Sequence, residues 1–251
     1  LLKRADQLDC EFIATGHYAK IRQENNRYIV SKGLDDTKDQ SYVLWGLKQE
    51  SLKRTKFPLG TYRKSEIKKM AEESGYIDLA NKSESYEICF VPDNDYRAFL
   101  KHKVEGLEEK VNGGNFVHTS GAMLGKHKGY PFYTIGQRKG LEIAVGEPLF
   151  VTEIIPETNT VMLGSKEDLE RQEMTVRNFN LIKYPDLKEP KDFLTKIRYK
   201  DVGAMASVRQ HEDKLKVLFS RKVTGVAPGQ SAVFYEGDDL VGGGFIERAI
   251  Y

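Results

Sequence analysis

Residues 10–18 read CEFIATGHY and decide the first part of the fold. A short apolar run ends in a turn that contains Gly16 and His17. Apolar residues at helical spacing precede it, so we expect a helix over residues 1–8 and a strand over residues 10–14. A helix, a strand and a glycine-containing loop at the carboxyl end of that strand are typical of α/β folds, and open parallel sheets bind their ligands at such loops.

Strand and helix signals continue to alternate after this turn. A strand is expected over residues 27–32 (RYIVSK), followed by a polar loop over residues 33–40 (GLDDTKDQ). The apolar run after the loop predicts a helix over residues 41–47, capped by Asp39 or Ser41.

Along the remaining chain the predicted elements change from helices to short strands. Two helices are expected, one from Ser65 to Gly75 and one over residues 95–103. Short strands and tight, glycine-rich turns follow from Gly113 onward. From Glu173 to the end only strand signals recur, at hairpin spacing, as expected for a small antiparallel barrel or sandwich.

Composition excludes several classes of protein. No apolar stretch approaches the roughly 18 residues that a transmembrane helix requires, and no signal peptide is recognisable, so no membrane partner is expected. The two cysteines are too few for a disulfide scaffold, which makes a cytoplasmic location the expectation. A net charge of +2 does not by itself predict a nucleic-acid binder. Because the sequence opens without methionine and inside a predicted helix, we expect it to belong to a longer protein.

No metal or dinucleotide site is predicted. The five histidines are scattered and the two cysteines lie far apart, so the spacing matches no zinc signature. Walker A and dinucleotide fingerprints are absent from the sequence. The three glycines at 242–244 fall between two strand runs, where they predict a bulge or close packing.

Two loops have residues suited to a ligand. Gly16 would let a nucleotide approach the backbone, with His17 beside it as a donor, although a plain turn explains the same residues. Lys38-Asp39-Gln40 combines a cation, an anion and an amide, which suits phosphates and base edges but equally suits water.

A third candidate is the basic run KIRYKD. Lys196, Arg198 and Lys200 alternate, which predicts that all three lie on one face of a strand and could meet an RNA backbone. A solvated strand face is the alternative. Tyr199 would point to the opposite face, so it can share a ligand with Arg198 only if the strand bulges or ends there.

Cys89 lies in the apolar run ICFV. A reactive cysteine must ionise, and the neighbouring Glu84 and Glu87 disfavour a thiolate. From these residues alone, an inert core thiol is the favoured interpretation.

The motifs also stand in a characteristic order, which is ATGHYAKI, DDTKDQSYVLWGL, FPLGTYRKSEIKKMA, SYEICFVPDNDYRAFL, GYPFYTIGQRKGL, KIRYKD and APGQSAVFYEGDDLVGGGFI. In that order they resemble the bacterial tRNA-specific 2-thiouridylase family, whose members convert the wobble uridine of certain tRNAs to 2-thiouridine. The resemblance spans essentially the whole chain.

The resemblance implies a multidomain fold that combines α/β and β parts. Residues 1–55 would be the C-terminal part of a truncated PP-loop (adenine nucleotide α-hydrolase-like) catalytic domain, with the 80–95 segment, which holds Cys89, packed on it. Residues 56–168 would form a small central α+β domain. Residues 169–251 would form a C-terminal antiparallel β-barrel that binds tRNA.

The resemblance also implies a two-step sulfur transfer. Mg-ATP would adenylate O2 of the uridine, and a persulfide on Cys89 would then displace AMP. The family's SGGVDS-type phosphate loop and its second cysteine, which could form a disulfide with Cys89, are not in this sequence, so we expect this chain alone to be inactive. Cys10 matches no functional position, and we assign it to the core.

The implied ligand contacts follow residue by residue. Gly16 matches the family's ATP-contacting glycine. The positions that match tRNA contacts are His17, Lys38, Asp39, Gln40, Arg198, Tyr199 and Gln230. The implied partners are tRNAs of the Lys, Glu and Gln types, and a cysteine desulfurase or sulfur-relay protein; no bound metal is implied.

Two other functions remain open. The chain could be a non-catalytic RNA-binding module that reads tRNA shape through its basic residues. It could also be a different PP-loop enzyme, such as an argininosuccinate-synthase-like ligase, but that function gives Cys89 no role.

Overall fold

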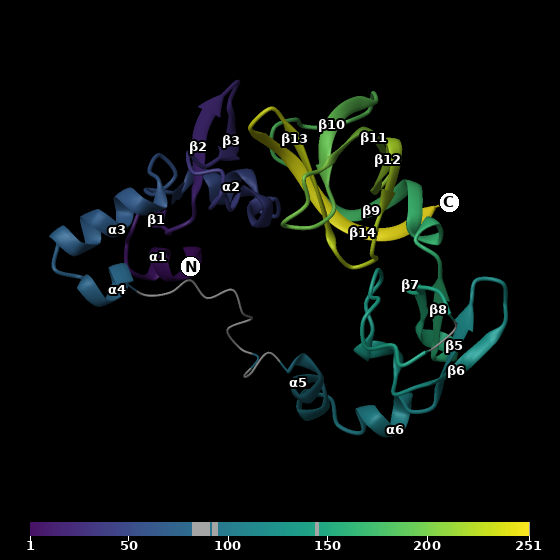
Figure 1. The fold of residues 1–251 in the computed structure, drawn as a ribbon. Helices are drawn as coiled ribbons and strands as arrows, with labels where there is room; N and C mark the ends of the chain where they lie inside the picture. Colours follow the sequence, from purple (N-terminus) through teal and green to yellow (C-terminus); the bar gives the residue numbers. More distant parts are fainter. Residues whose placement is uncertain (82–90, 92–94, 144–145, 251) are drawn as a thin grey trace. The chain divides into compact units, whose positions relative to one another are not determined.

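The computed structural model describes residues 1–81, 91, 95–143 and 146–250, and Figure 1 traces its elements. The α-helices are α1 (Leu2–Gln7), α2 (Gln49–Lys53), α3 (Lys64–Glu73), α4 (Ile77–Asn81), α5 (Tyr96–Lys103) and α6 (Leu107–Val111). The short 3-10 helices are η1 (Ser41–Leu44), η3 (Tyr130–Phe132), η4 (Pro156–Thr158) and η5 (Glu167–Leu169). The strands are β1 (Ile13–Ala14), β2 (Ala19–Glu24), β3 (Arg27–Lys32), β4 (Thr55–Lys56), β5 (Gly114–His118), β6 (Met123–His127), β7 (Phe150–Ile155), β8 (Thr160–Gly164), β9 (Glu170–Leu181), β10 (Lys191–Lys196), β11 (Ala204–His211), β12 (Lys214–Thr224), β13 (Ser231–Glu236) and β14 (Asp239–Ile250).

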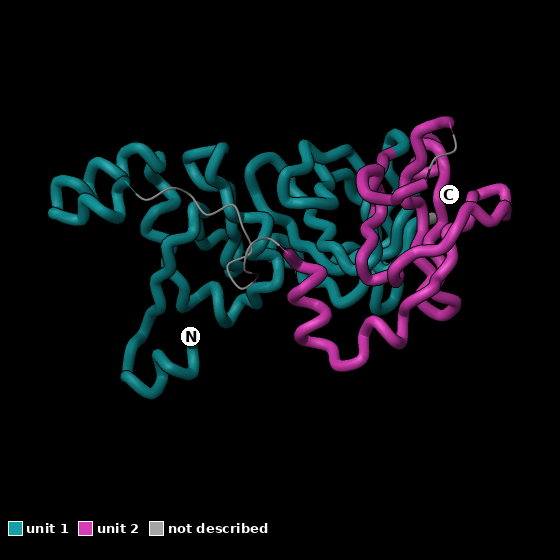
Figure 2. The backbone as a smooth tube through the Cα atoms, turned by 60° about the horizontal axis from the view of Figure 1, so that its bottom comes forward, with its two compact units in different colours: residues 1–82, 172–222, 227–251 teal, residues 83–171, 223–226 magenta. Residues whose placement is uncertain are grey.

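The chain divides into two compact units, which Figure 2 colours separately. Unit 1 consists of Leu1–Lys82, Gln172–Lys222 and Ala227–Tyr251, and unit 2 of Ser83–Arg171 and Val223–Val226. The boundaries after residues 55 and 168 stay predictions, and so does the packing of the 80–95 segment, most of which lies outside the described residues.

Six strands of unit 1 close into a barrel in the order β13-β10-β11-β12-β9-β14, because β14 returns to pair with β13. Burial alternates along β12, where Leu215, Val217 and Phe219 are buried and the residues between them are exposed. The C-terminal antiparallel barrel is confirmed. Closure leaves its strands without free hydrogen-bonding edges, which a small all-β domain otherwise has to protect.

The N-terminal segment joins the same sheet and the same core. The hairpin of β2 and β3 extends the sheet beside β14, with Ser31 in register with Asp239. The buried residues Val30 and Leu52 pack in one cluster with Val233 and Leu240 of the barrel. Burial of this shared apolar surface is therefore the main force that holds the two segments together.

The seam between these segments, meaning the contacts of residues 19–52 with the barrel, also has directed hydrogen bonds. Arg27 donates through Nε to the Ile182 carbonyl at 2.9 Å, and Asn180 donates through Nδ2 to the Trp45 carbonyl at 2.7 Å. Satisfied polar groups of this kind fix one orientation of the two segments, which apolar contact alone would not.

The glycine tract at 242–244 lies in β14, at the seam. The register of β14 against β9 shifts between Gly243 and Phe245, and a Cβ on Gly243 would lie 2.8 Å from Cγ of Trp45. Both expected roles of this tract, a bulge and close packing, are confirmed.

The α/β part of unit 1 is short. β1 and β4 pair in parallel, with Ile13 opposite Thr55, so the strand expected over residues 10–14 has only two paired residues. Cys10 lies in the loop between α1 and β1 and is exposed. Its predicted place in the core is wrong, because the paired part of the strand begins three residues later.

Unit 2 has helices and a sheet of its own. Asp95 caps α5 by accepting a hydrogen bond from the Ala98 N–H at 3.0 Å. The sheet has the order β6-β5-β8-β7 and buries Phe116, Val161 and Leu163 in a separate core. None of the helices in the described part of the chain combines the length and apolar character needed to cross a membrane.

Candidate nucleic-acid interface

The loop of residues 33–40, between β3 and η1, is anchored at one end by Asp35. The buried carboxylate of Asp35 accepts hydrogen bonds from the Lys64 N–H at 2.9 Å and from the hydroxyl and N–H of Thr37 at 2.7 and 3.1 Å. These donors, the Lys64 amide first, hold the pKa of the Asp35 carboxyl below its usual value. The loop is therefore tied to the start of α3.

Asp39 anchors the other end of the same loop. Its Oδ1 accepts from the N–H groups of Gly33 and Ser41, each at 3.1 Å, and its Oδ2 accepts from the Ser41 hydroxyl at 2.8 Å. The N-cap residue of η1 is Gln40, so the predicted cap at Asp39 or Ser41 is wrong, and η1 is shorter than the helix expected over residues 41–47. Asp39 instead holds the loop that precedes this turn. Its carboxylate is directed into the loop and shapes it.

Gln40 ties the loop to the turn that contains His17. Its Oε1 accepts from the Tyr18 N–H at 3.0 Å, and its own N–H donates to the Tyr18 carbonyl at 3.0 Å. Within the described residues the side-chain Nε2 of Gln40 has no partner, so it can donate to a base edge. Lys38 precedes these two anchored residues at the start of the tripeptide.

Tyr199 joins this loop to the barrel. Its hydroxyl donates to the Asp39 carbonyl at 2.9 Å, and its ring meets the Tyr42 ring edge-on with centroids 5.8 Å apart. Tyr199 is 45% exposed, enough for its ring to stack against a base. Burial raises the pKa of Tyr199 above its usual value and that of Tyr42 to about 12, so both hydroxyls are protonated donors at neutral pH.

The prediction that Lys196, Arg198 and Lys200 share one strand face is wrong. β10 ends at Lys196, where the Asp201 carboxylate accepts the Ile197 N–H at 3.1 Å and turns the chain. Arg198 and Lys200 are therefore exposed residues of a turn. The end of the strand is also the condition under which Arg198 and Tyr199 can contact one ligand.

Gln230 reaches the same surface from the loop before β13. It is exposed, and the next residue, Ser231, accepts hydrogen bonds from the Tyr42 hydroxyl at 2.7 Å and from Nε1 of Trp45 at 3.1 Å. The structure therefore brings the Lys38–Gln40 tripeptide, Tyr199 and Gln230 together around Tyr42. Tyr42, Ser41 and Ser231 were not predicted to belong to this surface, although they stand in the quoted strings DDTKDQSYVLWGL and APGQSAVFYEGDDLVGGGFI.

Gly16 and His17 follow the carboxyl end of β1. The Nδ1 of His17 lies 2.9 Å from the Thr15 hydroxyl, and its ring packs edge-on against Phe57. Gly16 is exposed, and a Cβ there would touch only Leu59, at 3.6 Å. An exposed glycine at the carboxyl end of a parallel strand fits the close approach of an adenine nucleotide.

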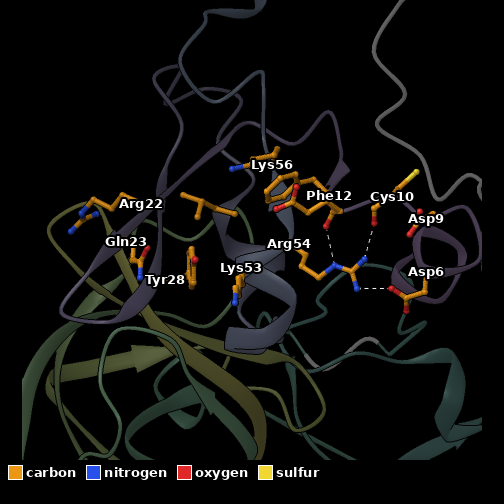
Figure 3. A pocket seen from close by; sticks show the side chains of 12 residues that line it. Asp6, Asp9, Cys10, Phe12, Arg22, Gln23, Tyr28, Lys53, Arg54 and Lys56 are labelled. Carbon is orange, nitrogen blue, oxygen red and sulfur yellow. Dashed lines mark hydrogen bonds and ion pairs between the residues drawn. The ribbon is translucent and has the colours of Figure 1, made fainter.

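A hollow of about 970 Å³ in unit 1 lies elsewhere (Figure 3). Phe12 and Lys56 line it, and Arg54 bridges the Asp6 carboxylate at 2.6 Å to the Cys10 carbonyl at 2.9 Å. Its walls come from α1 and the residues before β1, from the β2–β3 hairpin, and from the end of α2 through β4. None of the residues matched to ATP or tRNA lines this hollow.

Two further predictions concern sulfur and metal. Cys89 lies outside the described residues. Among the residues that are described, no group of three or more His, Cys, Asp or Glu side chains could hold a metal ion.

Comparison with known proteins covers nearly the whole chain. Residues 1–93 match the family described as tRNA methyl transferase HUP domain, residues 97–165 its PRC-barrel domain, and residues 171–246 the aminomethyltransferase β-barrel domain. Proteins named tRNA-specific 2-thiouridylase MnmA are 59% identical in Cytophaga hutchinsonii, 57% in Amoebophilus asiaticus and 55% in Salinibacter ruber. Each alignment covers 99% of this chain and 68%, 66% and 66% of the relative, so the chain spans about two thirds of their length.

Proposed function

Because this chain belongs to the tRNA-specific 2-thiouridylase family, we propose that it serves in the synthesis of 2-thiouridine at the wobble position of tRNA. The observation that carries the proposal is the gathering of the Lys38–Gln40 tripeptide, Tyr199 and Gln230 around Tyr42. Three segments that are distant in sequence thus contribute to one surface, on which we place the RNA.

The chemistry of this surface suits an unstacked anticodon loop. The exposed ring of Tyr199 offers a stacking platform, and Arg198 beside it offers a guanidinium to a phosphate. The amides of Gln40 and Gln230 offer donors and acceptors to base edges. Recognition of splayed bases by stacking and edge contacts is how proteins read single-stranded RNA.

The sulfur would be carried by Cys89 as a persulfide, delivered by a cysteine desulfurase or a sulfur-relay protein. Support comes from the ICF motif and the position of Cys89 within the family match. ATP, when bound, supplies the adenylyl group that activates O2 of the uridine, and the exposed backbone of Gly16 would hold the nucleotide. Thiolation would further require a phosphate loop and a second cysteine from outside residues 1–251.

The test compares the two cysteines of the chain. A desulfurase and free cysteine are supplied, and persulfides are located by alkylation and peptide mass spectrometry. We expect a persulfide on Cys89 and none on Cys10, which is exposed but belongs to none of the sites above. The variant C89S should lose the persulfide signal, and the matched control C10S should keep it.

Binding of tRNA is measured in parallel, with a wobble uridine or a wobble cytidine. Preference for uridine together with a Cys89 persulfide supports the proposal. Binding of tRNA without any persulfide would instead support a non-catalytic RNA-binding module. Methyl transfer, which two of the matched descriptions name, likewise gives no persulfide.

A further inference from the structure

Two lysines gather on one buried ring at the seam of unit 1. The Nζ atoms of Lys32 and Lys196 lie 5.3 and 5.8 Å from the centroid of the Tyr235 ring. Lys32 is the last residue of β3 and Lys196 is the last residue of β10, so one comes from the N-terminal segment and the other from the barrel. Both ammonium groups are held close to a ring that is 1% exposed.

Tyr235 is connected to the loop of the candidate interface. Its hydroxyl lies 3.0 Å from the Ser41 hydroxyl, which donates to the Asp39 carboxylate at 2.8 Å. Two hydrogen bonds therefore join Tyr235, the ring beside both lysines, to Asp39, whose carbonyl accepts a hydrogen bond from Tyr199. The two lysines adjoin the surface assigned to RNA. Lys196 belongs to the basic run that the sequence suggested for an RNA backbone, whereas Lys32 was not predicted to contact RNA.

The charges of the two lysines are poorly matched by the protein. Within the described residues, Lys32 has one ion pair, at 3.5 Å, to Asp238, whose side chain is 72% exposed. Lys196 forms no ion pair with any described residue. The nearby carboxylates of Asp39 and Asp201 accept hydrogen bonds from backbone N–H groups instead. Two ammonium groups on one ring repel each other unless an anion approaches.

We propose that Lys32 and Lys196 bind phosphate groups of the RNA backbone next to the nucleotides that the interface contacts. This inference rests on the proposed function. A lysine is a compact point charge without the planar fork that reads a guanine edge, so these two residues would position the RNA without reading its sequence. Their origin on both sides of the seam means that one RNA strand would bridge the N-terminal segment and the barrel.

The experiment measures tRNA affinity over a series of salt concentrations. Each phosphate contact contributes a fixed increment to the slope of log K against log salt. Lys32→Gln and Lys196→Gln should each reduce the magnitude of that slope by about 1, and the double variant by about 2. Their binding should weaken equally for tRNAs with and without a wobble uridine, because phosphates contain no sequence information.

The controls separate phosphate binding from support of the fold. Lys216→Gln removes an exposed lysine of β12 in the same unit and should leave the slope unchanged. Lys32→Arg and Lys196→Arg keep the charge and should retain the wild-type slope. A lowered melting temperature with an unchanged slope in the Gln variants would overturn the inference, because the lysines would then only brace Tyr235.

The same data distinguish this inference from the proposed function. If the unaltered chain does not prefer a wobble uridine but the slopes still fall in the Gln variants, the function fails and the phosphate contacts stand. If uridine is preferred and the slopes do not change, the function stands and the phosphate contacts fail.

Discussion

Unit 1 and unit 2 differ in how they use the chain. Unit 2 takes a nearly continuous stretch and buries its own core around Phe116 and Leu163. Unit 1 joins residues 1–82 to segments that begin ninety residues later in the sequence, and its cluster around Leu52 and Tyr235 contains residues of both parts. The difference indicates that in unit 1 the seam that stabilises the fold also positions the interface, whereas unit 2 has its own source of stability.

The largest effect on stability is expected from a substitution in the core that the N-terminal segment shares with the barrel. Leu52 is fully buried, so Leu52→Ala should cost about 2–5 kcal/mol of unfolding free energy. Hydrogen exchange should quicken in β2 and β3 and also in the barrel strands that pack on them. Leu163→Ala is the matched change in unit 2 and should leave exchange in unit 1 unaltered. Faster exchange in β2 and β3 alone would show that the seam is not cooperative.

The next effect concerns an ion network across the seam. Arg22 binds Asp239 through two hydrogen bonds of 2.6 and 2.8 Å, and Ser31 and Lys183 each donate to the same carboxylate at 2.7 Å. Asp239→Asn should destabilise unit 1 by about 2–3 kcal/mol near neutral pH, because Arg22 and Lys183 keep their charges without the full partner.

This network also predicts a pH dependence. The Arg22 hydrogen bonds hold the pKa of the Asp239 carboxyl far below its usual value, so the folded state favours the ionised form. The contribution is fully present above the unfolded pKa of about 3.9 and is lost as the pH falls toward the folded pKa. In urea titrations, the difference between the unaltered chain and Asp239→Asn should therefore shrink between about pH 5 and pH 2. A constant difference would contradict this assignment.

Much of unit 1 could be predicted from local pattern. The strand over residues 27–32 and the recurring strands after Glu173 depend on neighbouring residues, and both are confirmed. The pairing of Arg22 with Asp239 joins residues 217 positions apart, which no local pattern encodes. Alternation also continued through KIRYK, and only the Asp201 carboxylate reveals that β10 ends at Lys196.

The candidate site also has features that local sequence indicates and features that only the folded chain reveals. The residue types of the Lys38–Gln40 tripeptide suggested a ligand, and water explained them equally well. The structure adds the hydrogen bond of the Tyr199 hydroxyl to the Asp39 carbonyl, which the sequence did not indicate. Gln230 was predicted by family resemblance and not by its chemistry, because a single exposed amide has no local signature. The inward direction of the Asp39 carboxylate could be learned only from the folded loop.

A smaller effect is expected when the loop of the interface is altered without changing the core. Asp39→Ala removes three hydrogen bonds that shape the loop while leaving the shared core intact. We expect tRNA affinity to fall by about tenfold, or about 1.4 kcal/mol, with little change in the melting temperature. Affinity is measured by filter binding at constant salt. A large fall in melting temperature would mean that these hydrogen bonds stabilise the fold and do not act on the interface alone.

The smallest expected effect tests one hydroxyl. Tyr199→Phe removes the hydrogen bond to the Asp39 carbonyl but keeps the ring, so tRNA affinity should fall by about two- to fivefold. Tyr184→Phe is the matched control, because its hydroxyl binds Glu236 on the barrel. Equal losses in both variants would indicate a general effect of losing a tyrosine hydroxyl.

The position of Trp45 has an optical consequence. It is the one tryptophan in the 251-residue sequence, and its indole lies over Gly243, donates to Ser231 at 3.1 Å and meets the Phe245 ring edge-on at 5.2 Å. Its ultraviolet emission therefore reports on a single place, the seam next to the Gln230 loop. Separation of the N-terminal segment from the barrel would expose the indole to water and shift its emission to the red, so the chain contains its own fluorescent reporter of that movement.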